Sequence, residues 1–80
     1  MPFRLSINGC HIRDIETPEA ARAGLLWHLN RDFASADEKR RAETVPASEL
    51  AAEPLLVFVP GGGVLILEPI TQEEYRPDPV

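Results

Sequence analysis

The N-terminal residues alternate between apolar and polar side chains, which predicts a β-strand. Phe3, Leu5 and Ile7 occupy every second position, the period of a strand with one buried and one wet face. Asn8-Gly9 follows directly. Both residues tolerate the positive φ angles of a type I′ turn, so the pattern predicts that the chain reverses here into a hairpin.

The second strand of this hairpin is expected over residues 10–15. Neighbouring side chains of a strand point to opposite faces. Simple alternation therefore places Cys10 and Ile12 on one face and His11 and Arg13 on the other, so that the hairpin has a charged outer side.

A helix is predicted from Thr17-Pro18 to about Phe33. The hydroxyl is a suitable cap, and proline fits the first helical position because no N–H is needed there. Trp27 widens the side that would lie on a sheet, and Gly24 indicates a close approach of the helix to a strand. The stripe itself recurs at three- and four-residue spacings and comprises Arg22, Leu25, Leu26, Leu29 and Phe33.

The segment 34–54 is predicted to be a long connection, because small and charged side chains dominate it and two prolines interrupt it. Within it we expect a short strand at residues 42–45. A helical turn is expected at 48–53, capped by Ser48 and ended by Pro54.

A second hairpin is predicted from two apolar runs, residues 55–59 and 64–67, around the glycine-rich turn at 60–63. Both runs are apolar on both faces, which is typical of central strands. One helix covers only one face of a sheet. Either the 34–54 segment folds over the other face, or that face meets a partner.

These elements define an α+β fold of order β-β-α-loop-β-β. We expect an antiparallel sheet of two hairpins with one main helix packed on one face. Residues 1–70 would form a single domain, and residues 71–80, which are polar and rich in proline, a frayed C-terminal tail.

Composition bounds the compartment and the size of the core. Eighty residues allow one modest core. The longest apolar run, Leu55–Val59, is far shorter than a membrane span, and the N-terminus lacks the pattern of a secretory signal. Together with a lone cysteine, Cys10, these features predict a cytoplasmic protein without disulfides.

Charge is unevenly distributed along the chain. The net charge is −5, and residues 42–80 carry seven acids against one arginine, Arg76. Such a balance disfavours binding to a phosphate backbone and favours a basic partner if the acids share one face. The alternative is that the acids serve solubility.

The motifs that suggest chemistry have simpler interpretations. Adjacent Cys10 and His11 would point to opposite faces of a strand, so they form no nucleophile–base pair, and with His28 they lack the spacing of a zinc site. Residues 61–63 fit a hairpin turn better than a phosphate loop. The basic run 39–41 is flanked by acids and is expected to be a solvated segment. We therefore predict no enzyme activity, no cofactor and no metal.

The size, the acidic balance and the β-β-α-β-β order resemble the small anti-CRISPR inhibitors encoded by phages and other mobile elements, in particular inhibitors of type I-C systems. These proteins share no diagnostic motif, so no family residue is transferred to a position here. The resemblance implies that the protein binds a type I RNA-guided surveillance complex, Cascade, and keeps target DNA from binding. Carboxylates would then occupy a basic DNA-binding surface in place of phosphates, as a DNA mimic. The candidate carboxylates are Glu43, Glu49, Glu53, Glu68, Glu73 and Glu74.

A second hypothesis is a small accessory or regulatory protein that dimerises, or binds a protein partner, through the second hairpin. The contact would comprise Leu56, Phe58, Leu65 and Leu67, or the alternate set of these strands. The oligomeric state, monomer or homodimer, would test dimerisation by this face, and gene neighbourhood would separate the two hypotheses. Direct nucleic-acid binding is disfavoured by the acidic second half.

Overall fold

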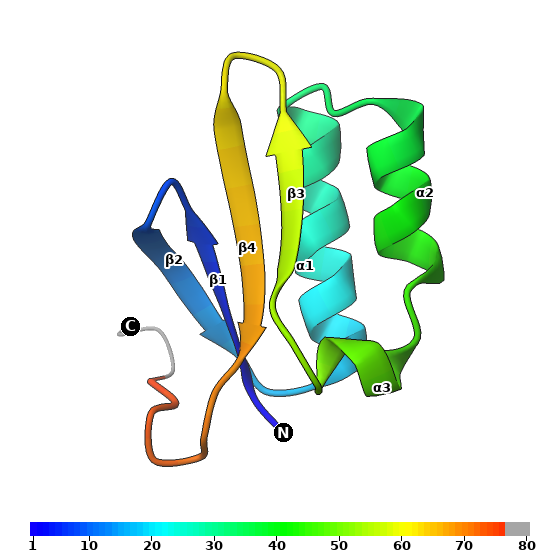
Figure 1. Ribbon diagram of the computed structural model, residues 1–80. Coiled ribbons are helices and arrows are strands. Elements are labelled where there is room, and N and C mark those ends of the chain that lie inside the picture. The colour runs from blue at the N-terminus through cyan, green and yellow to red at the C-terminus, as the bar shows by residue number, and fades with distance from the viewer. Residues whose placement is uncertain (77–80) are drawn as a thin grey trace.

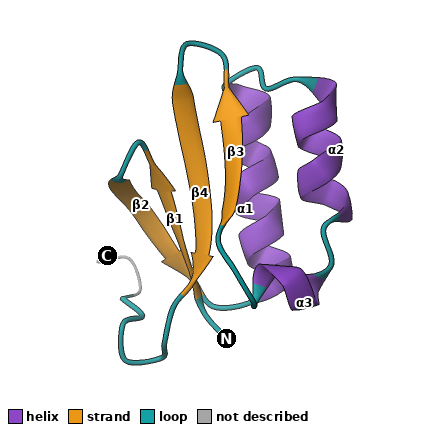
Figure 2. Ribbon diagram, viewed as in Figure 1, coloured by secondary structure: helices purple, strands orange, loops and turns teal. Residues whose placement is uncertain are grey.

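The computed structural model describes residues 1–76, which form an α+β fold with three helices beside a four-stranded sheet (Figures 1 and 2). The elements in chain order are β1 (Phe3–Ile7), β2 (Cys10–Ile15), α1 (Pro18–Arg31), α2 (Ala36–Thr44), α3 (Ala47–Leu50), β3 (Leu55–Val59) and β4 (Gly63–Pro69).

The sheet is antiparallel throughout, with strand order β2-β1-β4-β3. The two predicted hairpins are confirmed, and they join where β1 pairs with β4, with Leu5 opposite Leu67. Of the second hairpin, β4 is central as predicted, but β3 is an edge strand. The prediction that both of its strands are central is therefore wrong for β3.

The first hairpin turns at Asn8 and Gly9, whose φ angles are 50° and 83°. Both values are positive, as a type I′ turn requires. Asn8 also links the two hairpins, because its backbone N–H donates to Val64 O and its side-chain Oδ1 accepts from Val64 N.

A β-bulge in β2 changes the faces that simple alternation predicts. Leu5 pairs with Arg13 and Ser6 pairs with His11, so Ile12 is an extra residue between them. His11 therefore lies on the outer face of the sheet and Arg13 on the face that bears the helices. The prediction that His11 and Arg13 share one face is wrong, because an inserted residue reverses the alternation after it.

Helix α1 begins as predicted, with Thr17 Oγ1 accepting a hydrogen bond from Ala20 N and Pro18 in the first turn. It ends at Arg31, with Asp32 as its C-cap. Phe33 follows with a φ of 58° and is 83% exposed. Its predicted place in the buried stripe is therefore wrong, and Trp27, at 58% exposure, also lies outside the core.

The close approach predicted at Gly24 is confirmed. A Cβ atom at this position would lie 3.3 Å from Ile15 Cδ1 and 3.5 Å from an Arg13 guanidinium nitrogen, Nη2. Both side chains belong to β2. The missing side chain therefore lets α1 lie close to this edge of the sheet.

The segment 34–54 is helical where a connection with a short strand was predicted. Ser35 Oγ accepts from Glu38 N and caps α2, which ends at Thr44 and so replaces the expected strand at 42–45. The single buried side chain of α2 is Ala42. A helical turn is present after α2, but it begins at Ala47, and Pro46 rather than Ser48 is its N-cap.

The core lies between the helices and one face of the sheet. Fully buried Leu25 and Leu29 of α1 face Leu5, Val57 and Leu67 of the sheet. Helices α2 and α3 contact β3 and β4 from the same side (Figure 1). The sequence left open whether the 34–54 segment folds over the opposite face of the second hairpin. Neither α2 nor α3 covers that face.

The two faces of the second hairpin can be compared by matched truncations. Leu65→Ala should lower the free energy of unfolding by about 2–5 kcal/mol, because Leu65 is fully buried and its loss leaves a cavity. Leu56→Ala, in the same hairpin, should cost less than about 1 kcal/mol, because Leu56 is 43% exposed. Urea unfolding measures both values, and equal costs would contradict this assignment of faces.

Candidate functional site

The outer face of the second hairpin carries an exposed apolar patch. Phe58 is 64% exposed and Leu56 is 43% exposed. Their partners across the ladder, Val64 and Ile66, are half-buried. We call these four residues the β3–β4 patch.

Two residues of the predicted apolar interface do not belong to this patch. Leu65 and Leu67 are fully buried and pair with Val57 and Leu55, so they point toward the helices. The predicted set combined two opposite faces. The correct companions of Leu56 and Phe58 are the residues directly opposite them on β4.

The outer edge of β3 is closed by side chains of α2. Glu38 Oε2 accepts a hydrogen bond from Phe58 N at 3.1 Å, and Arg41 donates to Leu56 O. Glu38 and Arg41 also form an ion pair at 3.0 Å. They therefore occupy two of the backbone groups to which a further strand would bind, a common protection of an edge strand. Arg41 of the basic run 39–41 and the flanking acid Glu38 thus have a structural role.

The six predicted carboxylates lie on segments at one end of the molecule, the end where the N-terminus also lies (Figure 1). Glu43 is in the last turn of α2, Glu49 is in α3 and Glu53 follows α3. All three are exposed and form no ion pair with any residue of 1–76. We call them the helix-side carboxylates.

The other three carboxylates lie on and after β4 and are less free. Glu68 is half-buried and lies opposite Arg4 in the β1–β4 ladder. Glu74 Oε1 accepts hydrogen bonds from the backbone N–H and the hydroxyl of Thr71, which lower the pKa of Glu74. Glu73 is exposed, and its carbonyl oxygen accepts from Arg76. The structure thus places the segments that carry the six acids at one end of the molecule (Figure 1).

Residues 71–76, part of the segment expected to fray, form a turn that is bonded to the sheet. Arg4 donates to Glu74 O, and Arg76 N donates to Asp14 Oδ2 at 2.8 Å. Residues 77–80, the rest of that predicted tail, lie outside the described part of the chain.

A buried carboxylate, Asp14, joins the first hairpin to this turn. Arg4 donates to both of its oxygens, at 2.9 and 3.1 Å, and His11 Nε2 lies 2.8 Å from Oδ1. Asp14 thus accepts four hydrogen bonds, including the one from Arg76 N, although its side chain is fully buried. The hydrogen bonds from Arg4 lower the pKa of Asp14 to about 2, with help from Arg76 N and His11, although burial raises it.

Sequence reasoning did not identify this cluster. Arg4 and Asp14 are cross-strand partners because the bulge at Ile12 shifts the register, which the turn alone would set as Arg4 opposite Arg13. The bulge thereby brings Asp14 to the face of His11, and Arg76 reaches it because residues 71–76 fold back. The position of Asn8-Gly9 therefore gave no signal for this cluster.

The residues considered for catalysis or metal binding lie apart. Cys10 is exposed at the start of β2, His11 is bonded to Asp14, and His28 lies on α1. Among residues 1–76, no three His, Cys, Asp or Glu side chains are grouped to hold a metal ion. Gly61 and Gly62 adopt positive φ angles in the turn between β3 and β4, as a hairpin turn predicts.

Comparison of the chain with family models, with curated proteins and with solved structures gives no match. Among residues 1–76, no helix has both the length and the apolar character that a membrane crossing requires.

Asp14 predicts a specific dependence of stability on pH. Its folded pKa, about 2, is below the ordinary 3.8, so its contribution is present above pH 4 and is lost as the pH falls toward 2. The loss should be about 2 kcal/mol in the free energy of unfolding. Asp14→Asn should remove this part of the curve and lower stability at pH 7. Urea unfolding between pH 2 and pH 7 measures it.

Asp37→Asn is the matched control, because the Asp37 side chain is 92% exposed and its one ion pair within residues 1–76 is with Arg40, at 3.8 Å. It should change stability by less than about 0.5 kcal/mol at any pH. A wild-type curve with the same shape as that of Asp14→Asn would contradict the assignment.

Proposed function

We propose that the protein is a non-catalytic anti-CRISPR inhibitor. It binds a type I surveillance complex, of the I-C class, in the cytoplasm of a bacterial host and blocks target DNA binding. The observation that carries the proposal is the placement of the acidic segments at one end of the molecule (Figure 1). The resemblance in size, charge and element order supports the same function.

The helix-side carboxylates are the best candidates for contact. Glu43, Glu49 and Glu53 are exposed and unpaired in the described chain, so their charges remain available to a basic surface. A DNA channel is lined with Lys and Arg, and carboxylates replace phosphates there as counter-charges. Such a contact steers association and weakens with salt.

The proposal is tested by adding the protein to a purified type I-C complex and measuring its affinity for a fluorescent target duplex. The apparent Kd for DNA should rise with protein concentration. For the triple variant Glu43→Gln, Glu49→Gln, Glu53→Gln, the concentration that gives the same inhibition should be at least about tenfold higher than for the wild type. DNA affinity that is unchanged at saturating protein would reject the proposal.

A matched control removes acids from the opposite end of the helix layer. Asp32 follows α1 and Asp37 lies in the first turn of α2, at the end of the molecule away from Glu43 (Figure 1). Asp32→Asn with Asp37→Asn should inhibit as the wild type does. Equal loss in both variants would mean that net charge, not placement, governs binding.

The second candidate function is a dimerising or partner-binding accessory protein, and the β3–β4 patch favours it. Phe58 and Leu56 expose apolar surface that no helix covers. Burial of such side chains between two copies contributes about 25 cal/mol per Å² of apolar area.

Self-association through this patch predicts a dimer mass in light scattering and a monomer mass for Phe58→Lys. Phe33→Lys is the control, because Phe33 is 83% exposed after α1, outside the patch. A wild-type chain that remains monomeric at high micromolar concentration would contradict dimerisation.

A further inference from the structure

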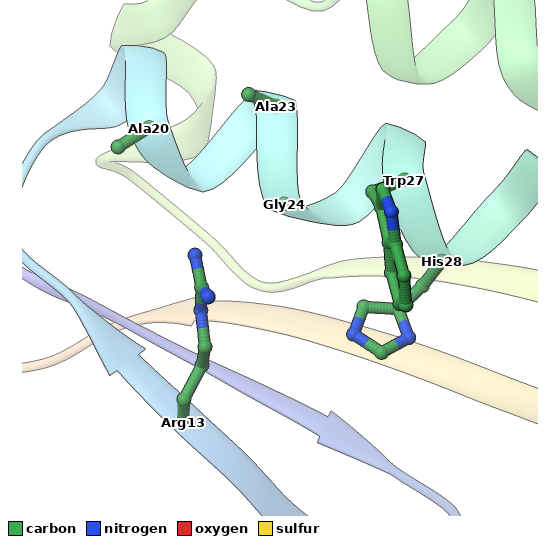
Figure 3. Close-up of a pocket in the computed structure, with 6 residues that line it drawn as sticks. All are labelled: Arg13, Ala20, Ala23, Gly24, Trp27 and His28. Carbon is green, nitrogen blue, oxygen red and sulfur yellow. The ribbon is translucent and has the colours of Figure 1, made fainter. Parts of the chain in front are cut away.

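A groove runs between α1 and the edge strand β2, on the side of the sheet that bears the helices (Figure 3). Its volume is about 440 Å³, within the range of ligand sites. The lining residues are Arg13, Ala20, Ala23, Gly24, Trp27 and His28. Three of them are small, so they leave room beside the helix, while Trp27 and His28 form one end of the groove.

The β-bulge turns Arg13 into this groove. Because Ile12 is the extra residue, Arg13 pairs with buried Leu5 and its side chain extends toward α1 (Figure 3). Its guanidinium lies over Gly24, where a Cβ atom would be 3.5 Å away. The Arg13 side chain forms no hydrogen bond or ion pair with the other residues of 1–76. Bulges of this kind often re-aim a side chain at a functional site.

The groove is a positive region on an acidic chain. Arg31 lies over the Trp27 ring, 5.6 Å from its centroid, and His28 packs edge-on against the same ring at 4.8 Å. Burial lowers the pKa of His28, Asp32 raises it, and Arg31 and Arg13 lower it further, which disfavours the imidazolium form. Arg13 is therefore the charged group within the groove, and it is complementary to a carboxylate.

The two edges of the sheet differ in what they offer to a further strand. At β3, Glu38 and Arg41 occupy the outward backbone groups. At β2, no hydrogen bond from another residue of 1–76 reaches the outward backbone groups. An extended peptide that pairs with β2 would direct alternate side chains toward α1 and thus into the groove.

We infer that β2 and the α1–β2 groove bind an extended segment of a partner protein, which adds as a fifth strand and places an acidic side chain against Arg13. A neighbouring apolar side chain of the segment, two residues away, packs on Ala23 and Trp27. This site is separate from the helix-side carboxylates and from the β3–β4 patch, so it stands or fails independently of the proposed function.

The test begins with a display library of random ten-residue peptides, selected on the full 80-residue chain. Enriched peptides should carry Asp or Glu two residues from an apolar residue. A fluorescein-labelled peptide of the enriched sequence should then bind in solution. Addition of the peptide should shift the amide cross-peaks of residues in β2 and in the first three turns of α1 of the protein, but not those of β3.

Variants of single surface residues then locate the contact. Arg13→Gln should weaken binding of the labelled peptide about tenfold or more, as the loss of a charge-assisted hydrogen bond predicts. Arg40→Gln is the control, because the Arg40 side chain is exposed on α2 and its one ion pair within residues 1–76 is with Asp37. Arg13 is exposed, so both variants should keep the wild-type unfolding midpoint. N-methylation of alternate peptide residues should also abolish binding, because it removes strand hydrogen bonds.

Several outcomes would overturn the inference. Selection without an acidic consensus, or unchanged affinity in Arg13→Gln, excludes the proposed ion pair. Shifts confined to β3 would place the peptide at the other edge. If the wild-type chain is a dimer in sedimentation and Arg13→Gln makes it monomeric, the occupant is a second copy of this chain rather than a partner segment.

Discussion

The structure depends on the burial of one face of the sheet by the helix layer. Leu25 and Leu29 of α1 pack on Leu5, Val57 and Leu67, and these residues account for much of the fully buried volume. A chain this short buries a modest fraction of its surface, and its helices leave the opposite face of the sheet uncovered. That face differs between its two halves. Beside β1 and β2, the Asp14 cluster gives it a polar cover. Beside β3 and β4, apolar side chains remain partly exposed.

The two edges of the sheet also differ from each other in how their backbone groups are protected. Helix α2 buries little, with Ala42 as its single buried side chain, yet its Glu38 and Arg41 satisfy the β3 backbone. Besides packing on α1, it therefore protects an edge of the sheet. Strand β2 has no such helix and instead carries a bulge, which both twists the edge and places Arg13 beside α1. One inserted residue thus places Asp14 on the outer face, where Arg4 and His11 bond to it, and turns Arg13 toward α1.

Elements with a regular apolar pattern were predictable from the sequence, and contacts between distant segments were not. Alternation and Asn8-Gly9 gave both strands of the first hairpin, and Thr17-Pro18 gave the start of α1. The bulge at Ile12 is invisible in such patterns, because its cause is pairing with β1. Helix α2 was missed because a polar helix with one buried alanine has no apolar stripe to detect. Leu65 and Leu67 were assigned to the wrong face because strands that are apolar on both sides carry no signal for register.

The acidic end follows from topology as much as from composition. Helix α2 runs toward the end where β3 begins and β4 finishes, so acids near 43–53 and 68–74 converge there although they are far apart in sequence (Figure 1). The C-terminal carbonyl groups of α2 would add negative partial charge, but Arg22 donates to Ala42 O, Glu43 O and Val45 O and offsets it. The negative charges at this end are therefore those of side chains. In the proposed function, the exposed Glu43, Glu49 and Glu53 would steer association with a basic partner, whereas a contact with defined geometry such as the Arg13 groove is better suited to fix orientation.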